Sequence, residues 1–236
     1  MSIETAITKD NLNVYLKELA KEFRRLNGKT MPAEIILIGG AAVLANYGFR
    51  DMTYDIDAVI AASSAMKEAA NNVGDRFGLQ NGWLNMDLRK TKSYSDKLAQ
   101  VSVYYKTYAN ILTIRTVTAE YLIAMKLMSG RKYKYDLSDV AGILLEHEKI
   151  GAPISRKAID NAMSELYGGW DGAPESSKTL LDVAFSSGDY REVYREIRAS
   201  EKEARETLLE FDETNPDALT EDNLADVLEK ARRKRE

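Results

Sequence analysis

The sequence predicts a mixed α/β fold, with strands in the first part of the chain and only helices in the last part. Short runs rich in Ile, Val and Leu, which are typical of strands, occur at residues 34–38, 54–60 and 110–117. Apolar residues three and four positions apart, which are typical of helices, lie between these runs and continue after them. We therefore expect a mixed-sheet core over residues 1–150 and an all-helical region over residues 151–236.

The first predicted elements are a helix, a strand and a second helix. Apolar residues on one helical face predict a helix over residues 12–26. β-Branched residues predict a strand over residues 34–38, which stops where Gly39 and Gly40 follow. Residues 41–45 are small or apolar and favour a helix. The two glycines, called the glycine turn below, therefore connect a strand to a helix.

The middle of the chain predicts the remaining strands. A strand over residues 54–60 is followed by a helix that starts near Ser63 and has its apolar residues on one side. Two further extended stretches, residues 98–105 and 110–117, alternate in part between apolar and polar side chains. Together with the first strand, these stretches predict a mixed sheet.

All later elements are predicted to be helical. Apolar residues recur at helical spacing from Thr118 onward, and a basic turn separates the first two of these helices. The last helix has Thr220 as its candidate N-cap, and basic residues near its end suit the helix dipole. The expected segments are residues 118–127, 137–144, 154–167, 178–184, 189–211 and 221–235.

The composition excludes several classes of function. The 236 residues include no cysteine, which rules out disulfides, thiolate zinc sites and thiol nucleophiles and suits a reducing cytoplasm. His147 is the single histidine, so a multi-histidine metal site is excluded. Residues 35–50 are too short and too polar to span a bilayer, and residues 1–11 lack the apolar region of a secretory signal. We therefore expect a cytoplasmic protein without a membrane partner.

The charge is unevenly distributed along the chain. The formal net charge is −4, which argues against a protein that coats nucleic acid over its whole surface. Residues 88–135, however, contain ten Lys and Arg side chains against two acidic ones, with seven tyrosines among them. This mixture is typical of a surface that neutralises phosphates and stacks bases. It is also typical of a solvated face whose lysines and tyrosines cover a core.

Asp55 and Asp57 form the first candidate for chemistry, and we call them the acidic pair. Residues two apart on a strand point to the same face, about 7 Å from each other. Two negative charges at that distance favour a divalent cation, and hard carboxylate oxygens favour Mg²⁺, or Mn²⁺ in its place. Two solvated aspartates at an exposed strand end are the structural alternative.

The glycine turn is the second candidate. Gly39 and Gly40 lie between a strand and a helix, where backbone N–H groups can hold a triphosphate that no Cβ obstructs. The sequence contains neither the GxxxxGK[ST] nor the GxGxxG pattern of other nucleotide-binding folds. A simple tight turn is the structural alternative for the two glycines.

These candidates and several later residues together resemble the DNA polymerase β-like nucleotidyltransferase superfamily. The similarity is greatest to its AbiEii-type branch, which includes toxins of toxin–antitoxin systems. It covers residues 34–145 and does not extend to the helical region after residue 151. The motifs that carry it are Ile38-Gly39-Gly40-Ala41-Ala42, Arg50, Thr53, Asp55-Ile56-Asp57, the segment from Glu120 to Leu127, Arg131, and the segment from Asp136 to Asp139.

The resemblance implies Mg²⁺-dependent transfer of a nucleoside monophosphate from a nucleoside triphosphate (NTP) to an acceptor. The glycine turn would hold the β- and γ-phosphates, and Asp55 and Asp57 would hold the metal. Arg50 would steady a phosphate, or would form a surface ion pair with Asp51. Thr53 would place a hydroxyl near the metal, or would serve only as a strand residue.

The same resemblance gives roles to two residues on the following helices. Lys126 would point to the nucleotide phosphates; the alternative is a lysine that extends its charge to solvent. Asp136 would deprotonate the acceptor or orient Lys126, although a carboxylate is favoured at a helix start in any case. Asp139 lies one helical turn further on and is the weaker candidate of the two aspartates.

Two features depart from the pattern of the superfamily. Ala41 stands where many relatives have a hydroxyl residue, so phosphate contacts would rest on backbone groups. Residues 110–117 contain no third carboxylate, and the nearby acids, Asp87 and Asp96, are predicted to lie in loops. The sequence is therefore compatible with a site that holds one metal ion, or with an inactive descendant that only binds nucleotide.

Three functions follow from these observations. The first is nucleotide transfer to an RNA 3′ end, which the basic, tyrosine-rich segment favours, with an antitoxin protein as a possible partner. The second is transfer to a small molecule, as in aminoglycoside-modifying relatives, which the negative net charge suits. The third is a catalytically silent module that binds nucleotide or an antitoxin.

Overall fold

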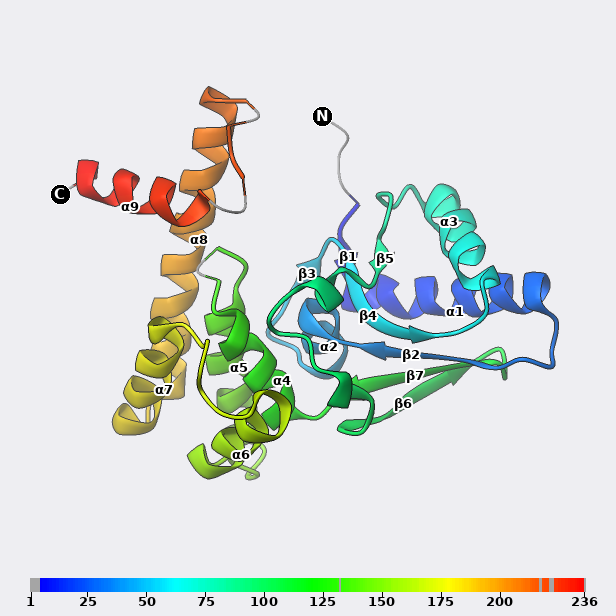
Figure 1. Cartoon of the computed structure of the whole chain (residues 1–236), viewed down its shortest axis with the longest axis horizontal. Coiled ribbons are helices and arrows are strands. Elements are labelled where there is room, and N and C mark those ends of the chain that lie inside the picture. The colour runs from blue at the N-terminus through cyan, green and yellow to red at the C-terminus, as the bar shows by residue number, and fades with distance from the viewer. Residues whose placement is uncertain (1–4, 132, 217, 221–222, 236) are drawn as a thin grey trace.

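The computed structural model describes residues 5–131, 133–216, 218–220 and 223–235. The fold is mixed α/β, with a sheet and its covering helices on one side and a group of helices on the other (Figure 1). The described part of the sheet has five strands in the order β5-β4-β2-β7-β6, and β1 and β3 form a separate two-stranded ribbon. The strands are β1 (Ile7–Thr8), β2 (Ala33–Leu37), β3 (Met52–Thr53), β4 (Ile56–Ala61), β5 (Leu84–Asn85), β6 (Ser102–Tyr108) and β7 (Leu112–Val117).

The sheet mixes parallel and antiparallel pairs. β2 lies at its centre and runs antiparallel to β4 and parallel to β7. β5 extends the sheet in parallel beside β4, and β6 lies antiparallel to β7 at the opposite edge. This order confirms the predicted mixed sheet and brings the end of β2, where the glycine turn begins, next to the start of β4.

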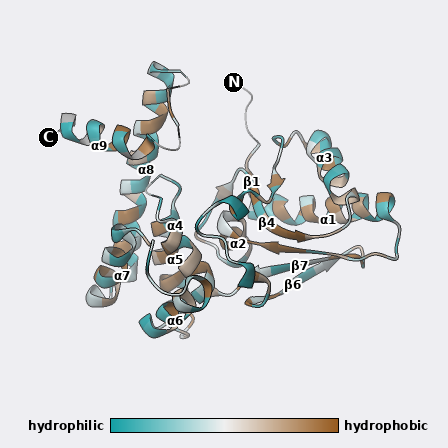
Figure 2. Cartoon of the chain, in the orientation of Figure 1, coloured by the Kyte–Doolittle hydropathy of each residue, from teal (hydrophilic) through white to brown (hydrophobic). Residues whose placement is uncertain are grey.

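Helices α1 (Lys9–Asn27) and α3 (Ala65–Phe77) lie side by side over one face of the sheet (Figure 1). Thr8 caps α1, because its hydroxyl accepts a hydrogen bond from the Asn11 N–H while the Asn11 side chain accepts one from the Thr8 N–H. The apolar stripe of α1 is buried from Leu12 to Phe23, as the helical spacing predicts, and only Leu26 at its end is partly exposed. β2 and β4 are hydrophobic along most of their length (Figure 2).

The remaining long helices form the second group. α4 and α5 pack against each other, α4 also packs on α6, and α5 packs on α8 (Figure 1). Figure 2 shows that α8 and α9 are mainly hydrophilic, in contrast to the central strands. The helices of this group are α4 (Ala119–Ser129), α5 (Asp136–Lys149), α6 (Arg156–Tyr167), α7 (Glu175–Ser187), α8 (Tyr190–Thr214) and α9 (Leu224–Arg235), whereas the short helix α2 (Gly39–Asn46) packs on β4 beside the sheet.

The predicted elements are present, with differences at several boundaries. The strand predicted from residue 54 begins at Ile56, which leaves Asp55 just before β4. The extended stretch predicted from Leu98 begins with the 3-10 turn Asp96–Ala99 and becomes a strand only at Ser102. Strands β1, β3 and β5 were not predicted, because two residues are too short for a periodic pattern.

Some predictions lie outside the described residues. These are Glu221 and Asp222, with which the last helix was expected to begin, and Lys132 of the basic segment. None of the described helices is both long and apolar enough to cross a bilayer. The division of the chain at residue 150 stays a prediction.

Candidate functional site

The glycine turn and the acidic pair meet where β2 and β4 lie side by side. The N–H of Ile38 donates to the carbonyl of Asp57 over 3.1 Å, which ties the start of α2 to β4. Gly39 has a φ of +58°, a left-handed conformation that glycine adopts without strain. A Cβ on Gly39 would lie 3.3 Å from the Oδ2 atom of Asp57. The Asp57 carboxylate therefore lies directly against the glycine turn.

The start of α2 is free to receive an anion. Its N-cap residue is Ile38, which has no side-chain oxygen, and no side chain caps the helix. The first N–H groups of a helix have no partner within the helix, and the dipole adds positive potential there. Because Gly39 and Gly40 carry no Cβ, an anion can approach these N–H groups closely.

Gly40 faces the two other residues predicted for nucleotide binding. A Cβ on Gly40 would lie 2.8 Å from the Nη2 atom of Arg50 and 3.1 Å from the Oγ1 atom of Thr53. Thr53 is buried and its hydroxyl donates to the Asp55 carbonyl over 3.2 Å. The glycine turn thus allows Arg50 and Thr53 to pack against the start of α2, beside the acidic pair.

The electrostatics of the acidic pair fit a cation site. Burial and the neighbouring charge of Asp55 raise the pKa of Asp57, while Arg131, Lys126 and Lys134 act in the opposite direction. The ionised pair is therefore destabilised without a cation. No three His, Asp or Glu side chains of the described chain converge on a possible metal position. A metal ion held by the two carboxylates of the acidic pair would therefore take its remaining ligands from a substrate.

Lys126 and Asp136 belong to a second group, which we call the buried ion network: Arg50, Lys126, Arg131, Asp136 and Asp139. The Nζ atom of Lys126 lies 2.9 Å from Oδ1 of Asp136 and 2.8 Å from Oδ2 of Asp139. Arg131 Nε reaches Oδ2 of Asp136 over 2.9 Å, and Arg50 pairs with Asp139. The network therefore connects α4, α5 and the segment that precedes β3.

The network is largely closed to solvent. Lys126, Asp136 and Asp139 are 5%, 0% and 1% exposed. Burial alone would raise the pKa of Asp136, but the charges and hydrogen bonds of Lys126 and Arg131 lower it well below its ordinary value. Burial lowers the pKa of Lys126, but Asp136 and Asp139 outweigh this effect and raise it. Both side chains stay ionised, and Lys126 and Arg131 neutralise the charge of Asp136.

Asp139 makes more contacts in the buried ion network than we expected from its position in the sequence. It pairs with both Lys126 and Arg50, and its second oxygen, Oδ1, is buried without a hydrogen-bond partner among the described residues. The available signal was its position one turn after Asp136, which places both carboxylates on one face of α5. Arg131 completes the network and also lowers the pKa of Asp57.

The sequence analysis assigned no role to α8, yet this helix contacts the site. Glu201 is 3% exposed and accepts hydrogen bonds from the N–H groups of Leu137 over 2.9 Å and Ser138 over 3.3 Å. It therefore caps the start of α5, directly after Asp136. Burial raises the pKa of Glu201 to about 7. Its signal in the sequence is a set of charged residues at helical spacing on the buried side of α8: Arg198, Glu201 and Arg205.

A cleft of about 430 Å³ opens beside the acidic pair, and we call it the α8 cleft. Its walls come from residues 50–55, residues 133–135 and one face of α8. Arg198 lies 3.6 Å from the ring centre of Tyr135, and Arg205 lies 5.7 Å from that of Tyr54 and 6.0 Å from that of Tyr135. Asp55 and Thr53 border the cleft on the side of the glycine turn.

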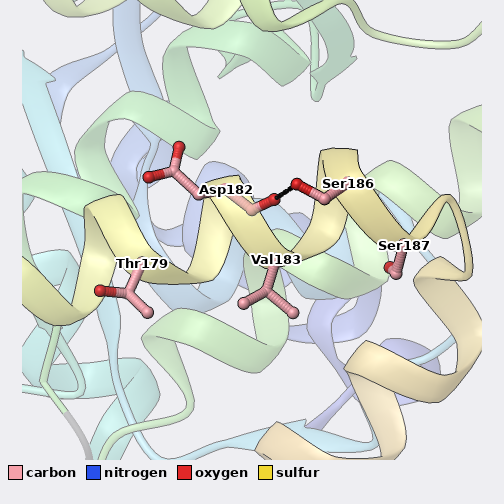
Figure 3. Close-up of a pocket in the computed structure, with 5 residues that line it drawn as sticks. All are labelled: Thr179, Asp182, Val183, Ser186 and Ser187. Carbon is pink, nitrogen blue, oxygen red and sulfur yellow. Dashed lines mark hydrogen bonds between the residues drawn. The ribbon is translucent and has the colours of Figure 1, made fainter.

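A second cavity, of about 510 Å³, lies on α7, away from these residues (Figure 3). Figure 3 shows that all the side chains drawn belong to one helix, and that Asp182 points away from Val183. Asp182 is already paired with Arg156 over 2.8 Å. The cavity shares no lining residue with the α8 cleft, and its hydroxyl and carboxylate side chains all come from α7.

The sequence-predicted residues thus meet in one place. Asp57 lies against Gly39, Arg50 and Thr53 lie against Gly40, and Asp55 borders the same region. Lys126 and Asp136 lie behind them in the buried ion network, joined to Arg50 through Asp139. The structure adds Arg131, Asp139 and the charged face of α8 to this set.

Comparison with known proteins gives a family for the chain. A solved structure of an antigenic nucleotidyltransferase-like protein from Paracoccidioides brasiliensis is similar over 81% of this chain and 95% of its own, with 14% sequence identity and a TM-score of 0.44. No curated protein matches the sequence. The family model described as "Nucleotidyltransferase of unknown function (DUF6036)" matches residues 14–167, which include the glycine turn, the acidic pair and the whole buried ion network. The chain therefore belongs to this family of nucleotidyltransferases of unknown function.

Proposed function

We propose that the protein transfers a nucleoside monophosphate from an NTP to an acceptor hydroxyl, with Mg²⁺ held by the acidic pair. One observation carries the proposal: the Asp57 carboxylate lies against Gly39, at a helix start that no side chain caps. A metal-binding carboxylate and an anion-binding turn are thereby in contact. This is the arrangement that a metal-bound triphosphate requires.

The residues present fit Mg²⁺ bound together with substrate. Mg²⁺ in phosphate-transferring sites is held by one or two carboxylates and by the substrate phosphates, not by a complete protein cage. Asp55 and Asp57 supply the two carboxylates, and burial and the neighbouring charge of Asp55 disfavour the ionised state of Asp57 without a cation. When bound, the cation would neutralise negative charge on the phosphates; Mn²⁺ has the same ligand preference.

The step follows from the placement of the chain's own groups. The N–H groups of Gly39 and Gly40 hold the β- and γ-phosphates, so that the α-phosphorus lies beside the acidic pair. The acceptor oxygen forms a bond to the α-phosphorus while the bond to the bridging oxygen of pyrophosphate breaks. The hydroxyl proton leaves to water. Lys126 and Asp136 hold Arg131 and the start of α5 in position, because their own charges are paired.

The proposed acceptor is an RNA 3′ end. The α8 cleft supports this choice, because it presents tyrosines and basic side chains next to Asp55. The resemblance to the AbiEii-type branch extends the proposal to a toxin that acts in the cytoplasm and is neutralised by an antitoxin protein.

Transfer of label tests the proposal. Each of four α-labelled NTPs is incubated with the protein and Mg²⁺ in the presence of total RNA, protein or small-molecule extract, and wild type is compared with Asp55→Ala/Asp57→Ala. We expect label in the RNA fraction with wild type only. Label in the small-molecule fraction would show that the acceptor is a small molecule and not RNA. Metal-dependent NTP binding without label in any fraction would identify a silent binding module.

A further inference from the structure

We propose that the α8 cleft is the acceptor subsite and that Arg198 and Arg205 bind phosphates of the RNA strand whose end enters it. This inference rests on the proposed function and deepens it. It assigns acceptor binding to α8, a helix that lies beyond the part of the chain matched by the family model.

The position of the cleft separates it from the triphosphate site. Its border includes Thr53 and Asp55 but neither glycine of the turn. A triphosphate held at Gly39 and Gly40 therefore does not need the far end of the cleft, where Arg205 and Leu208 lie. The volume of about 430 Å³ is in the range of small-molecule sites and is large enough for a nucleotide. A second substrate can thus enter next to the acidic pair.

The two arginines are oriented by aromatic rings, and Arg205 also donates hydrogen bonds to the side chains of Tyr54 and Tyr135. A guanidinium is planar, and its N–H groups lie in that plane. Because Arg198 is stacked on Tyr135 at 3.6 Å, the ring takes one face and leaves the N–H edge available. Neither Arg198 nor Arg205 forms an ion pair with a carboxylate of the described chain. Phosphate oxygens match this fork geometry better than any neutral group.

The charge of the cleft favours an anionic acceptor over a polycationic one. Its lining holds four basic residues, Arg50, Lys134, Arg198 and Arg205, against three acidic ones, Asp51, Asp55 and Asp212. Arg50 is already paired with Asp139, and the phosphates of the NTP are assigned to the glycine turn, so Arg198 and Arg205 on α8 are the cations that a second anionic substrate would meet. An RNA strand supplies negative charge together with bases that can stack on Tyr54 and Tyr135.

The cleft wall is held in place by two structural features. Tyr135 has a φ of +61°, a conformation that is uncommon for a large side chain and that fixes its direction toward α8. Glu201 lies between the two arginines in the sequence of α8 and caps the start of α5. Both arginines are therefore presented by a helix that is tied to the buried ion network.

Equilibrium binding tests this inference independently of turnover. The full chain is titrated against a short, fluorescently labelled single-stranded RNA, and separately against Mg²⁺-NTP. We expect Arg198→Ala and Arg205→Ala each to weaken RNA binding about tenfold and to lower its salt dependence by about one phosphate contact. NTP binding should stay within twofold of wild type. Arg195→Ala is the control, since Arg195 lies one turn earlier on α8 and its side chain is 75% exposed.

The variants also separate a structural effect from a binding effect. Arg198→Lys keeps a positive charge but loses the planar fork, so we expect RNA binding between that of wild type and Arg198→Ala, at unchanged melting temperature. Loss of NTP binding with unchanged RNA binding would overturn the inference and assign the cleft to the NTP. The inference would also be overturned if Arg198→Ala and Arg205→Ala bound RNA as tightly as the control variant Arg195→Ala.

Failure of the acceptor subsite can be distinguished from failure of the proposed transferase function. Asp55→Ala/Asp57→Ala should abolish transfer and leave RNA binding at least as strong as in wild type, because Asp55 borders the cleft and its removal takes away a negative charge there. If wild type transfers no nucleotide but binds RNA through Arg198 and Arg205, the subsite stands and the transferase proposal fails. If the Arg198→Ala and Arg205→Ala variants transfer nucleotide to RNA as well as wild type does, the transferase proposal stands and the acceptor subsite fails.

Discussion

The acidic pair and the buried ion network both contain aspartates, but the carboxylates of the two regions have opposite electrostatic surroundings. In the network, Asp136 is 0% exposed and is paired with both Lys126 and Arg131. In the acidic pair, Asp57 is half-buried beside another carboxylate, against a glycine turn with free N–H groups. Opposite shifts in pKa follow: that of Asp136 is lowered and that of Asp57 is raised.

This difference distinguishes supporting charges from charges available to a ligand. A buried carboxylate with cations around it is satisfied by the protein and contributes to the arrangement of its neighbours. A half-buried carboxylate next to another is satisfied only when a cation binds. Of the residues predicted for catalysis, Lys126 and Asp136 belong to the first kind and Asp55 and Asp57 to the second.

The largest expected effect comes from breaking the buried ion network. Asp136→Ala leaves Lys126 and Arg131 without their shared partner in a buried position. We expect the free energy of unfolding, measured by denaturant titration, to fall by about 3–5 kcal/mol. The control is Lys90→Ala, which removes the exposed pair with Asp87. It should lower the free energy of unfolding far less, because solvent screens an exposed pair. Equal losses for the two variants would show that the network is not a supporting unit.

Glu201 is a third kind of carboxylate, because it is buried like Asp136 but has no ion-pair partner among the described residues. Burial raises its pKa from 4.5 to about 7, so the folded state binds its proton more tightly than the unfolded state. The contribution of this group to stability is therefore full below about pH 4.5 and is lost as the pH rises to about 7.

Glu201→Gln removes this titration while keeping the shape of the side chain. Relative to wild type, we expect the variant to gain stability between pH 4.5 and pH 8, by up to about 3 kcal/mol. Denaturant titrations of both proteins at several pH values measure the difference directly, and other titrating groups cancel. A difference that does not change with pH would contradict the raised pKa.

Gly39→Ala tests the contact between the glycine turn and the acidic pair. The φ of +58° disfavours any Cβ, and the new methyl group would lie 3.3 Å from the Asp57 carboxylate. We expect a loss of about 1–2 kcal/mol in stability. Weaker Mg²⁺-NTP binding in calorimetry should accompany it. Gly48→Ala is the control, because nothing lies within 4 Å of that position. Unchanged NTP binding in Gly39→Ala would argue against phosphate at the turn.

The smallest expected effect on stability is that of Asp57→Asn. The amide removes a half-buried charge and its repulsion with Asp55, so the melting temperature without ligand should stay equal or rise slightly. Stabilisation by Mg²⁺-NTP should disappear in the same variant, in a thermal-shift measurement. A clear loss of stability without ligand would mean that the protein itself satisfies the Asp57 charge.

The sequence predicted the mixed sheet and the glycine turn because periodicity and glycine placement are local properties. Asp55, Asp57 and Gly39 lie close to strand ends whose positions a short pattern reveals. The strand that contains Asp57 was placed two residues too early, since Tyr54 and Asp55 continue the same extended pattern. Two-residue strands such as β3 leave no such pattern.

The contacts of α8 could not be predicted in this way. Glu201 meets the N–H groups of Leu137 and Ser138 across more than sixty residues of sequence, and only tertiary structure brings them together. The resemblance offered Asp136 as a residue that orients Lys126, but an isolated lysine on an apolar helix gave no sign of its second partner, Asp139. Long-range pairing of charges decides which residues support the site and which remain free for a ligand.

The most direct test compares the two regions in one measurement, the shift in melting temperature on adding Mg²⁺ and an equimolar mixture of four NTPs. A ligand that binds only the folded state stabilises it by an amount that grows with the logarithm of the ligand concentration divided by Kd, and so raises the melting temperature. We predict a shift for wild type, no shift for Asp57→Asn at unchanged starting stability, and a retained shift for Asp136→Asn at lowered starting stability. A full shift in Asp57→Asn would contradict the assignment of the acidic pair as the metal-nucleotide site.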